Sequence, residues 1–232
     1  MGVIVEDSLV ETLNRLDDAL LFDGELPLER RLRVARWIAA RQGMPGAYRG
    51  TLFAPTERDF ANGGGVYTGE KVRSGAGLAC KFGLEAARSL IRLGVEDPLV
   101  NDALVRASDG MIRNLGGSQV SPPLGMYCCG SCSVAMWRLL AAGGLNHRRR
   151  RLEAGIALLH SRRDGKGRWR SFPFYYTLMA LGEMDHQARP AMAISEIRYA
   201  AATCIKCLRR LPKDDPLSKR RREVLQRALA KC

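Results

Sequence analysis

The sequence predicts an all-α fold, and three observations support this prediction. Apolar residues recur at the three- and four-residue spacing of amphipathic helices through most of the chain. Serine, aspartate and proline stand directly before several of these stretches, where helices begin. No stretch alternates apolar and polar residues in the manner of a half-buried strand. The chain of 232 residues suits one domain that spans residues 1–232.

Amphipathic helices are expected at both ends and in the middle of the chain. Ser8 and Glu11 form a capping-box pattern at the start of the first helix. Pro27 and the Asp97–Pro98 pair mark two further starts, because proline fits the first turn of a helix. Ser218 is expected to open the last helix. The apolar stripes are Leu9, Leu13, Leu16 and Leu20; Leu28, Leu32, Ala35 and Ala39; Val100, Leu104, Ala107, Met111 and Leu115; Leu152, Ile156 and Leu159; Ile194, Ile197, Ala201, Cys204, Leu208 and Leu211; and Leu225 and Leu229.

Three other stretches are apolar nearly all round, which indicates helices that are buried on every side. They span residues 74–93, 130–142 and 173–184, and their glycine stops are Gly94, Gly143 and Gly182. An amphipathic helix is expected after each of them, at 98–115, 150–162 and 194–210. A buried helix, a turn and an amphipathic helix therefore repeat along the chain, which is typical of stacked helical hairpins.

The loops between the hairpins share a Gly-x-aromatic ending. It occurs at Gly46–Tyr48, Gly125–Tyr127 and Gly167–Trp169. Glycine permits backbone turns that a Cβ atom would forbid, and the aromatic ring that follows is large enough to pack between neighbouring hairpins. We therefore expect Trp169 to lie wedged between hairpins.

This alternation of buried and amphipathic helices resembles the α/α-toroid repeats of squalene/hopene cyclases and protein prenyltransferase β subunits, over residues 70–210. "FPFYYTLMALGEM" is similar to the segment in which Phe-Tyr-His-Thr opens an inner helix of that family. "GSCSVAMWRLLAAGGL" is similar to the segment in which Asp-x-Cys opens another. The resemblance implies about four helical hairpins plus a terminal helix, in an open arc or completed by oligomerisation.

The resemblance also implies candidate catalytic positions. In the family, Asp, Cys and His bind a zinc ion that activates a substrate thiol. Cys132 stands at the cysteine position, whereas Gly130 replaces the aspartate and Tyr176 replaces the histidine. The Asp-x-Asp-Asp motif of the cyclases is missing. Cys132 and Tyr176 are the catalytic candidates, and whether the chain is an enzyme is left open.

An apolar, isoprenoid-like small molecule is the ligand that the resemblance implies. Such a ligand needs an apolar cavity lined by aromatic side chains, and the inner helices carry several of them. Guanidinium groups match phosphate oxygens, so arginines of the loop before the third buried helix could clamp a diphosphate. The alternatives are that the rings pack the hairpins together and that the arginines are solvated. The candidate ligand-binding residues are Tyr127, Trp137, Phe174, Tyr175, Arg168 and Arg170.

Three cysteines, in "YCCGSC", stand at the start of the second buried helix. Cys129 and Cys132 form a Cys-x-x-Cys pair, and Cys128 lies next to them. The amide groups at a helix N-terminus favour a thiolate, which is the form that binds zinc or attacks an electrophile. Zinc is therefore a possible cofactor, with Cys129 and Cys132 as ligands and Cys128 as a third option. The alternatives are reactive thiols without metal, of which at least one is exposed to the cavity, and packing, in which all three sulfurs are buried. Cys132 is the cysteine expected to face the cavity, and Cys128 is expected to pack.

Composition narrows the partners and the location. The net charge of +13 invites a nucleic-acid interpretation, but the basic residues are scattered through every segment, which argues against it. No apolar run reaches the length of a membrane span, and the start of the chain lacks the pattern of a signal peptide, so we expect a cytoplasmic protein. The leading hypothesis is an apolar-ligand module. The alternatives are a non-catalytic scaffold for a protein partner or a second copy of the chain, and a basic nucleic-acid-binding solenoid.

Overall fold

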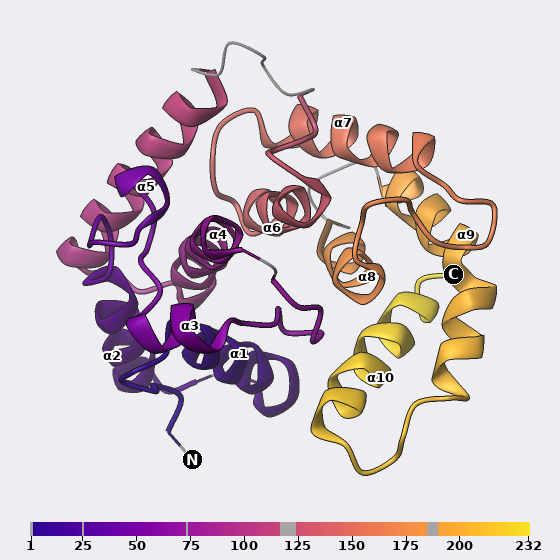
Figure 1. Cartoon of the computed structure of the whole chain (residues 1–232), viewed down its shortest axis with the longest axis horizontal. Helices are drawn as coiled ribbons and strands as arrows, with labels where there is room; N and C mark the ends of the chain where they lie inside the picture. The colour runs from indigo at the N-terminus through magenta and orange to yellow at the C-terminus, as the bar shows by residue number, and fades with distance from the viewer. Residues whose placement is uncertain (1, 25, 73, 117–123, 185–189) are drawn as a thin grey trace. The chain divides into compact units, whose positions relative to one another are not determined.

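The computed structural model confirms the all-α fold (Figure 1). It describes residues 2–24, 26–72, 74–116, 124–184 and 190–232, and these residues contain ten α-helices and no strand. None of the described helices is long and apolar enough to span a membrane. The chain divides into two compact units. Unit 1 comprises residues 1–67, 71–119 and 142–146, and unit 2 comprises residues 68–70, 120–141 and 147–232. The prediction of one domain over residues 1–232 stays a prediction.

Unit 1 is built around one long buried helix, α4, which packs against α1, α2 and α5. Nearly every side chain of α4 from Leu78 to Leu90 is buried, as the apolar stretch at 74–93 predicts. A helix without a polar face is stable only when neighbours cover it on all sides. The helices of unit 1 are α1 (Leu9–Asp18), α2 (Leu28–Ala39), α3 (Glu57–Asn62), α4 (Gly75–Leu93) and α5 (Pro98–Gly116), with a π-helix at Ala19–Asp23.

The predicted helix starts at Ser8 and at Asp97–Pro98 are confirmed, whereas Pro27 is the capping residue before α2 and does not lie in its first turn. The Ser8 hydroxyl accepts a hydrogen bond from the Glu11 amide at 2.9 Å, and an Asp97 carboxylate oxygen accepts one from the Val100 amide at 3.2 Å. The buried Asp59 extends this capping, because it accepts bonds from the Ser8 hydroxyl at 2.6 Å and the Leu9 amide at 2.9 Å. One carboxylate thus joins α3 to the start of α1.

Unit 2 contains two buried helices, α6 and α8, and each is followed by an amphipathic one. α6 packs against α7 and α8, and α8 packs against α9 and α10. The predicted burial of 130–142 and 173–184 is confirmed by the burial of α6 and α8, whereas the arrangement of the hairpins in a toroid stays a prediction. The helices are α6 (Gly130–Ala141), α7 (Arg148–Ser161), α8 (Phe174–Glu183), α9 (Pro190–Leu208) and α10 (Pro216–Leu229).

The start of the last helix differs from the prediction. α10 begins at Pro216, before Ser218, because Asp215 is the capping residue. An Asp215 carboxylate oxygen accepts bonds from the amide and the hydroxyl of Ser218, both at 2.8 Å. These bonds and the Arg221 charge lower the pKa of Asp215. An aspartate followed by proline is a stronger helix start than the serine because the proline occupies a position that needs no amide donor.

Close backbone contact fixes α7 against the segment before α6. A Cβ atom on Gly125 would lie 2.2 Å from the Gly155 nitrogen, so only glycine fits there. The Trp137 indole donates a hydrogen bond to the Gly125 carbonyl at 2.8 Å and its ring stacks on Phe172, with the centroids 5.4 Å apart. The loop expected from the Gly-x-aromatic pattern is therefore anchored by the helix that follows it.

The loop from Ser161 to Ser171 connects α7 with α8, and Trp169 is its buried anchor. Only 3% of Trp169 is exposed. Its ring lies 6.2 Å from that of Phe174 on α8 and 6.1 Å from that of Tyr199 on α9, measured between centroids. The ring is buried as expected, and it packs against both helices of the one hairpin that follows the loop. A position between two hairpins stays a prediction.

Trp169→Ala is expected to lower the free energy of unfolding by about 3–5 kcal/mol, because it removes a large buried ring from between two helices. Trp169→Phe keeps most of the ring and loses the indole donor, so its expected loss is smaller, about 1–3 kcal/mol. Denaturant titration followed by circular dichroism measures both. A loss for Trp169→Ala within about 0.5 kcal/mol, as at exposed sites, would contradict the wedge.

Gly125→Ala and Gly182→Ala are expected to change stability in opposite directions. The first forces the backbone at Gly155 to move. Gly182 lies inside α8, which continues to Glu183, so the predicted glycine stop at this position is wrong. A Cβ atom there would meet nothing within 4 Å, and alanine is favoured over glycine inside a helix by about 0.5–1 kcal/mol. Thermal unfolding of the two variants measures the difference, and a destabilised Gly182→Ala would show that the site is more crowded than the structure indicates.

Candidate functional site

The two units differ in charge, and this difference points to the candidate site. Unit 2 holds 22 lysines and arginines against 9 aspartates and glutamates, a balance of +13. Unit 1 holds 15 residues of each sign and is neutral. The whole net charge of the chain therefore belongs to unit 2. Both kinds of charge are divided unevenly, since unit 2 has more basic and fewer acidic residues than unit 1. Charge asymmetry between two parts of a chain is typical of proteins that bind polyanions.

Both units contain ion pairs, but more of the described exposed cations of unit 2 lie outside them. In unit 1, the arginines of several helices contact carboxylates; the pairs are Arg15–Glu11, Arg36–Asp97, Arg58–Asp7, Arg88–Asp17 and Arg106–Asp102. In unit 2, many exposed cations make no ion pair with any residue that the structure describes. They are Arg148, Arg150, Arg162, Lys166, Arg170, Lys206, Arg209, Arg210 and Lys213. An uncompensated basic surface remains.

The first turn of α7 concentrates this charge. His147 precedes the helix, and Arg148, Arg149 and Arg150 form its first turn, with no acidic residue and no side-chain cap. The amide groups of a first turn lack helical acceptors and carry a partial positive charge, so cations are unfavourable there. Helix stability therefore does not explain three arginines at this end.

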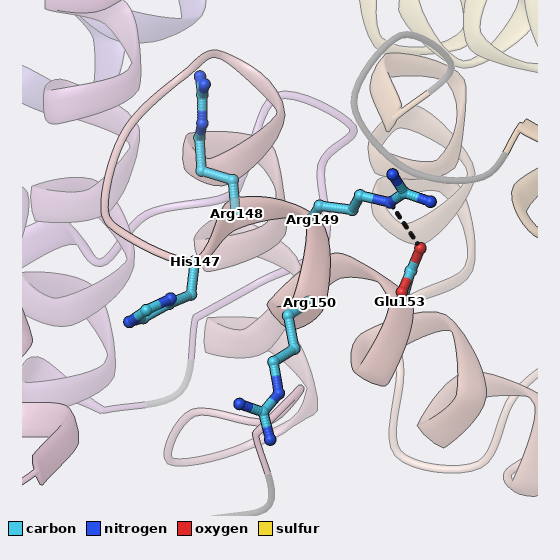
Figure 2. A pocket seen from close by; sticks show the side chains of 5 residues that line it. All are labelled: His147, Arg148, Arg149, Arg150 and Glu153. Carbon is cyan, nitrogen blue, oxygen red and sulfur yellow. Dashed lines mark hydrogen bonds and ion pairs between the residues drawn. The ribbon is translucent and has the colours of Figure 1, made fainter.

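A surface pocket surrounds this helix start, and the same residues line it together with Glu153 (Figure 2). Arg149 turns towards Glu153, with 3.0 Å between its Nε and a carboxylate oxygen. The side chains of Arg148 and Arg150 extend in opposite directions from the start of the helix, and His147 points away from both (Figure 2). Because these cations diverge, each is placed to meet a different anionic group.

Two carboxylates order the arginine-rich loop so that its remaining cations face solvent. Asp164 accepts bonds from the amides of Lys166 at 2.7 Å and Arg168 at 3.0 Å, and these bonds lower its pKa. The buried Glu196 on α9 accepts bonds from the Trp169 indole at 2.9 Å and the Arg163 guanidinium at 2.8 and 3.0 Å. Hydrogen bonds to these two carboxylates therefore fix the conformation of the loop.

The arginines predicted to clamp a diphosphate lie in different environments. The Arg168 guanidinium lies 4.3 Å from the centroid of the Phe174 ring, and one of its nitrogens lies 3.7 Å from the Cys207 sulfur. Arg170 is exposed. Arg168 therefore packs on α8 and α9, while Arg170 is available to an external ligand.

The aromatic candidates mostly pack against one another. Trp137 and Tyr127 are buried, and Phe174 is 5% exposed, with its ring 5.3 Å from that of Tyr175. Tyr175 is half-buried under the Arg221 guanidinium, which lies 4.6 Å from its ring centroid. These contacts agree with the packing alternative for the rings.

Tyr176, the catalytic candidate, lies inside unit 2. It has no exposed surface, and the Arg138 guanidinium lies 5.4 Å from its ring centroid. Arg138 is itself fixed by Glu183, with 2.9 Å between their charged atoms. Tyr176 thus belongs to a buried cation–π contact.

The cysteines before α6 are arranged differently from the expectation. Cys132 is 1% exposed, whereas Cys128 and Cys129 are exposed. The Cys129 sulfur accepts a hydrogen bond from the Cys132 amide at 3.4 Å and so caps α6. The sulfurs of Cys128 and Cys132 lie within 4.8 Å of each other, and two thiolates at such a distance can share one zinc ion. Zinc binding stays a prediction, with Cys128 in place of Cys129 as the partner of Cys132.

Sequence reasoning missed two acidic residues that organise unit 2. Glu70 accepts bonds from the amides of Tyr175 at 3.0 Å and Tyr176 at 3.1 Å, and so caps α8 across 105 residues of sequence. Glu196 had a visible signal, because it interrupts the apolar stripe of its helix between Ala193 and Ile197. A charged residue inside such a stripe is buried only when it is paired.

Comparisons with protein-family models, curated proteins and solved structures find no match to this chain.

Glu196→Gln is expected to destabilise the protein by about 3–5 kcal/mol, because it leaves Arg163 without its buried counter-charge. Glu153→Gln removes an exposed pair with Arg149 and is the matched control, with an expected loss of about 1 kcal/mol or less. Denaturant midpoints at constant slope give both values. Equal losses in the two variants would contradict the special role of Glu196.

Proposed function

We propose that unit 2 binds a polyanion through its basic surface, and that this polyanion is nucleic acid. The observation that carries the proposal is the location of the whole net charge of +13 in unit 2, with exposed arginines that no carboxylate neutralises. Lysine and arginine contacts to phosphates release counterions and supply most of the affinity of nonspecific nucleic-acid binding.

The geometry of α7 favours a polymer over a single anion. Arg148 and Arg150 extend in opposite directions, so one phosphate cannot meet both, whereas successive phosphates of a strand can (Figure 2). The amides of the first turn add a partial positive charge at the same place. The loop after the opposite end of α7 carries three more exposed cations, Arg162, Lys166 and Arg170, which are available for further phosphate contacts.

An anionic membrane surface is the other polyanion to consider. Helices that bind membranes present a broad apolar face beside their basic one. In the described part of unit 2, the large apolar side chains that are exposed are Leu124 and Ile205, and they do not form such a face. Nucleic acid therefore fits the surface better.

The hypotheses that rest on the family resemblance stay predictions. They are an apolar, isoprenoid-like ligand, a toroid arrangement, zinc at the cysteines before α6, and a scaffold for a protein partner. The packing of Trp137, Phe174 and Tyr176 reduces the aromatic surface that remains for an apolar ligand. Half-buried Tyr175 is the candidate that retains most access.

Fluorescence anisotropy with labelled single- and double-stranded oligonucleotides tests the proposal. We expect dissociation constants of about 1–100 μM near physiological salt, the range for nonspecific nucleic-acid binding. The affinity should fall steeply as the salt concentration rises from about 50 to about 200 mM, because a surface with several phosphate contacts releases several counterions. Arg148→Gln with Arg150→Gln should weaken binding and lower the salt slope by about 2, because each phosphate contact contributes about 0.9.

The matched control is Arg30→Gln with Arg33→Gln, which changes the charge equally at two exposed positions of α2 in the neutral unit. It should leave both the affinity and the salt slope unchanged. Equal weakening by the two double variants would show that only the overall charge matters. Binding to phosphatidylserine vesicles without binding to oligonucleotides would replace nucleic acid by a membrane surface.

A further inference from the structure

Two cysteines at the start of α6 have their sulfurs close together. The sulfurs of Cys128, which precedes the helix, and Cys132, in its first turn, lie within 4.8 Å of each other. A disulfide bond is about 2 Å long, so the two sulfurs must approach by less than about 3 Å to form one. Rotation about the two Cα–Cβ bonds moves the sulfurs over such a distance. The pair is therefore placed for a disulfide as well as for a shared metal ion.

Hydrogen bonds fix the backbone that carries the two cysteines. The Ser133 hydroxyl accepts a bond from the Tyr127 amide at 2.8 Å and donates one to the Cys129 carbonyl at 2.7 Å. The Ser133 amide donates to the same carbonyl at 2.9 Å. The Cys129 sulfur accepts a bond from the Cys132 amide at 3.4 Å, so it is engaged at the helix start. These bonds close a turn that begins before the first cysteine of the pair and ends after the second.

Gly130, between the two cysteines, fixes the middle of this turn. A Cβ atom there would lie 2.0 Å from the Ser171 carbonyl oxygen, so only glycine fits against the loop before α8. A disulfide would enclose the five residues from Cys128 to Cys132, whose backbone is already ordered. Closing the disulfide therefore costs little further conformational entropy.

The two thiols differ in their access to solvent. Cys128 is exposed, whereas only 1% of Cys132 is exposed. A dissolved reagent therefore reaches Cys128 first, and Cys132 attacks a sulfur that is brought next to it. The amide groups of the first turn favour a negative charge on Cys132, and the thiolate is the attacking form in thiol–disulfide exchange. The exposed thiol is thus placed to react first, and the buried one to displace the reagent.

We propose that Cys128 and Cys132 are a dithiol pair that low-molecular-weight disulfides oxidise to an intramolecular disulfide. The Cys128 thiolate attacks one reagent sulfur, the bond between the two reagent sulfurs breaks, and half of the reagent leaves with the electron pair. The Cys132 thiolate then attacks the Cys128 sulfur of this mixed disulfide, and the second half leaves in the same way. Each departing half takes up one of the protons that the two cysteines release. The two protein sulfurs lose two electrons and the reagent becomes two thiols, so no other oxidant is needed.

Oxidised glutathione is the probe, added to the full-length chain after a chelator has removed any bound metal. The remaining thiols are alkylated, and mass spectrometry of the tryptic peptide 114–138, which contains Cys128, Cys129 and Cys132, locates the oxidised sulfurs. The Cys128–Cys132 disulfide is expected to exceed either disulfide of Cys129 by at least about tenfold, because the folded turn brings the correct sulfurs together. In denaturant, where this turn is lost, the preference should disappear. The α7 arginines take no part, so the result is independent of nucleic-acid binding.

Cys132→Ser removes the thiol that displaces the reagent, so the glutathione adduct on Cys128 should rise at least about tenfold above its level in the unchanged protein. Cys129→Ser is the matched control: serine also caps helices, and the Cys128–Cys132 disulfide should still form. A lasting adduct on Cys128 in the unchanged protein, a disulfide through Cys129 or no reaction would overturn the proposal. The same preference in denaturant would overturn it too, and this comparison needs no variant, so it holds if a substitution disturbs α6.

Discussion

The buried carboxylate of Glu196 is the interaction on which the architecture of unit 2 depends. A buried charge is tolerated only when donors surround it, and here they come from three places along the chain. The Trp169 indole and the Arg163 guanidinium belong to the loop between the hairpins, and the His160 ring, 3.0 Å away, belongs to the end of α7. One residue of α9 thus fixes the end of one hairpin and the whole connection to the next.

This internal use of acidic residues explains why the surface of unit 2 is basic. Glu70 caps α8, Asp215 caps α10, Asp164 orders the arginine-rich loop, and Glu183 holds the buried Arg138. With Glu196, these residues account for five of the nine acids of the unit, and each of them is engaged in folding. Two causes therefore leave the surface cations without counter-charges. Unit 2 has more basic than acidic residues, and most of its acidic residues bond to groups within the fold.

The helices could be predicted from sequence because their causes are local. Capping residues lie within three positions of the amides that they bond, as at Ser8 and Asp97, and apolar periodicity is read in a short window. The cap of α8 could not be predicted, because Glu70 lies 105 residues from Tyr175. The charge of the site did have a signal in the sequence, because residues 147–232 alone hold 21 lysines and arginines against 8 aspartates and glutamates. It was missed because the scatter of basic residues was judged over the whole chain, without the balance of acidic residues in each part.

The positive charges at the start of α7 oppose folding and favour the binding of an anion. Arginines in the first turn of α7 face the positive end of the helix dipole, and they repel one another. Unit 1, by contrast, pairs several of its arginines with carboxylates, as at Arg36–Asp97 and Arg88–Asp17, so the unpaired arginines of α7 are a feature that an anionic ligand would explain. A phosphate strand would relieve this repulsion by supplying negative charges to the surface. The acidic residues of unit 2 do not supply them there, because most of them are engaged within the fold. The uncompensated basic surface is thus better explained as a binding surface for an anionic partner than as a surface that contacts only solvent.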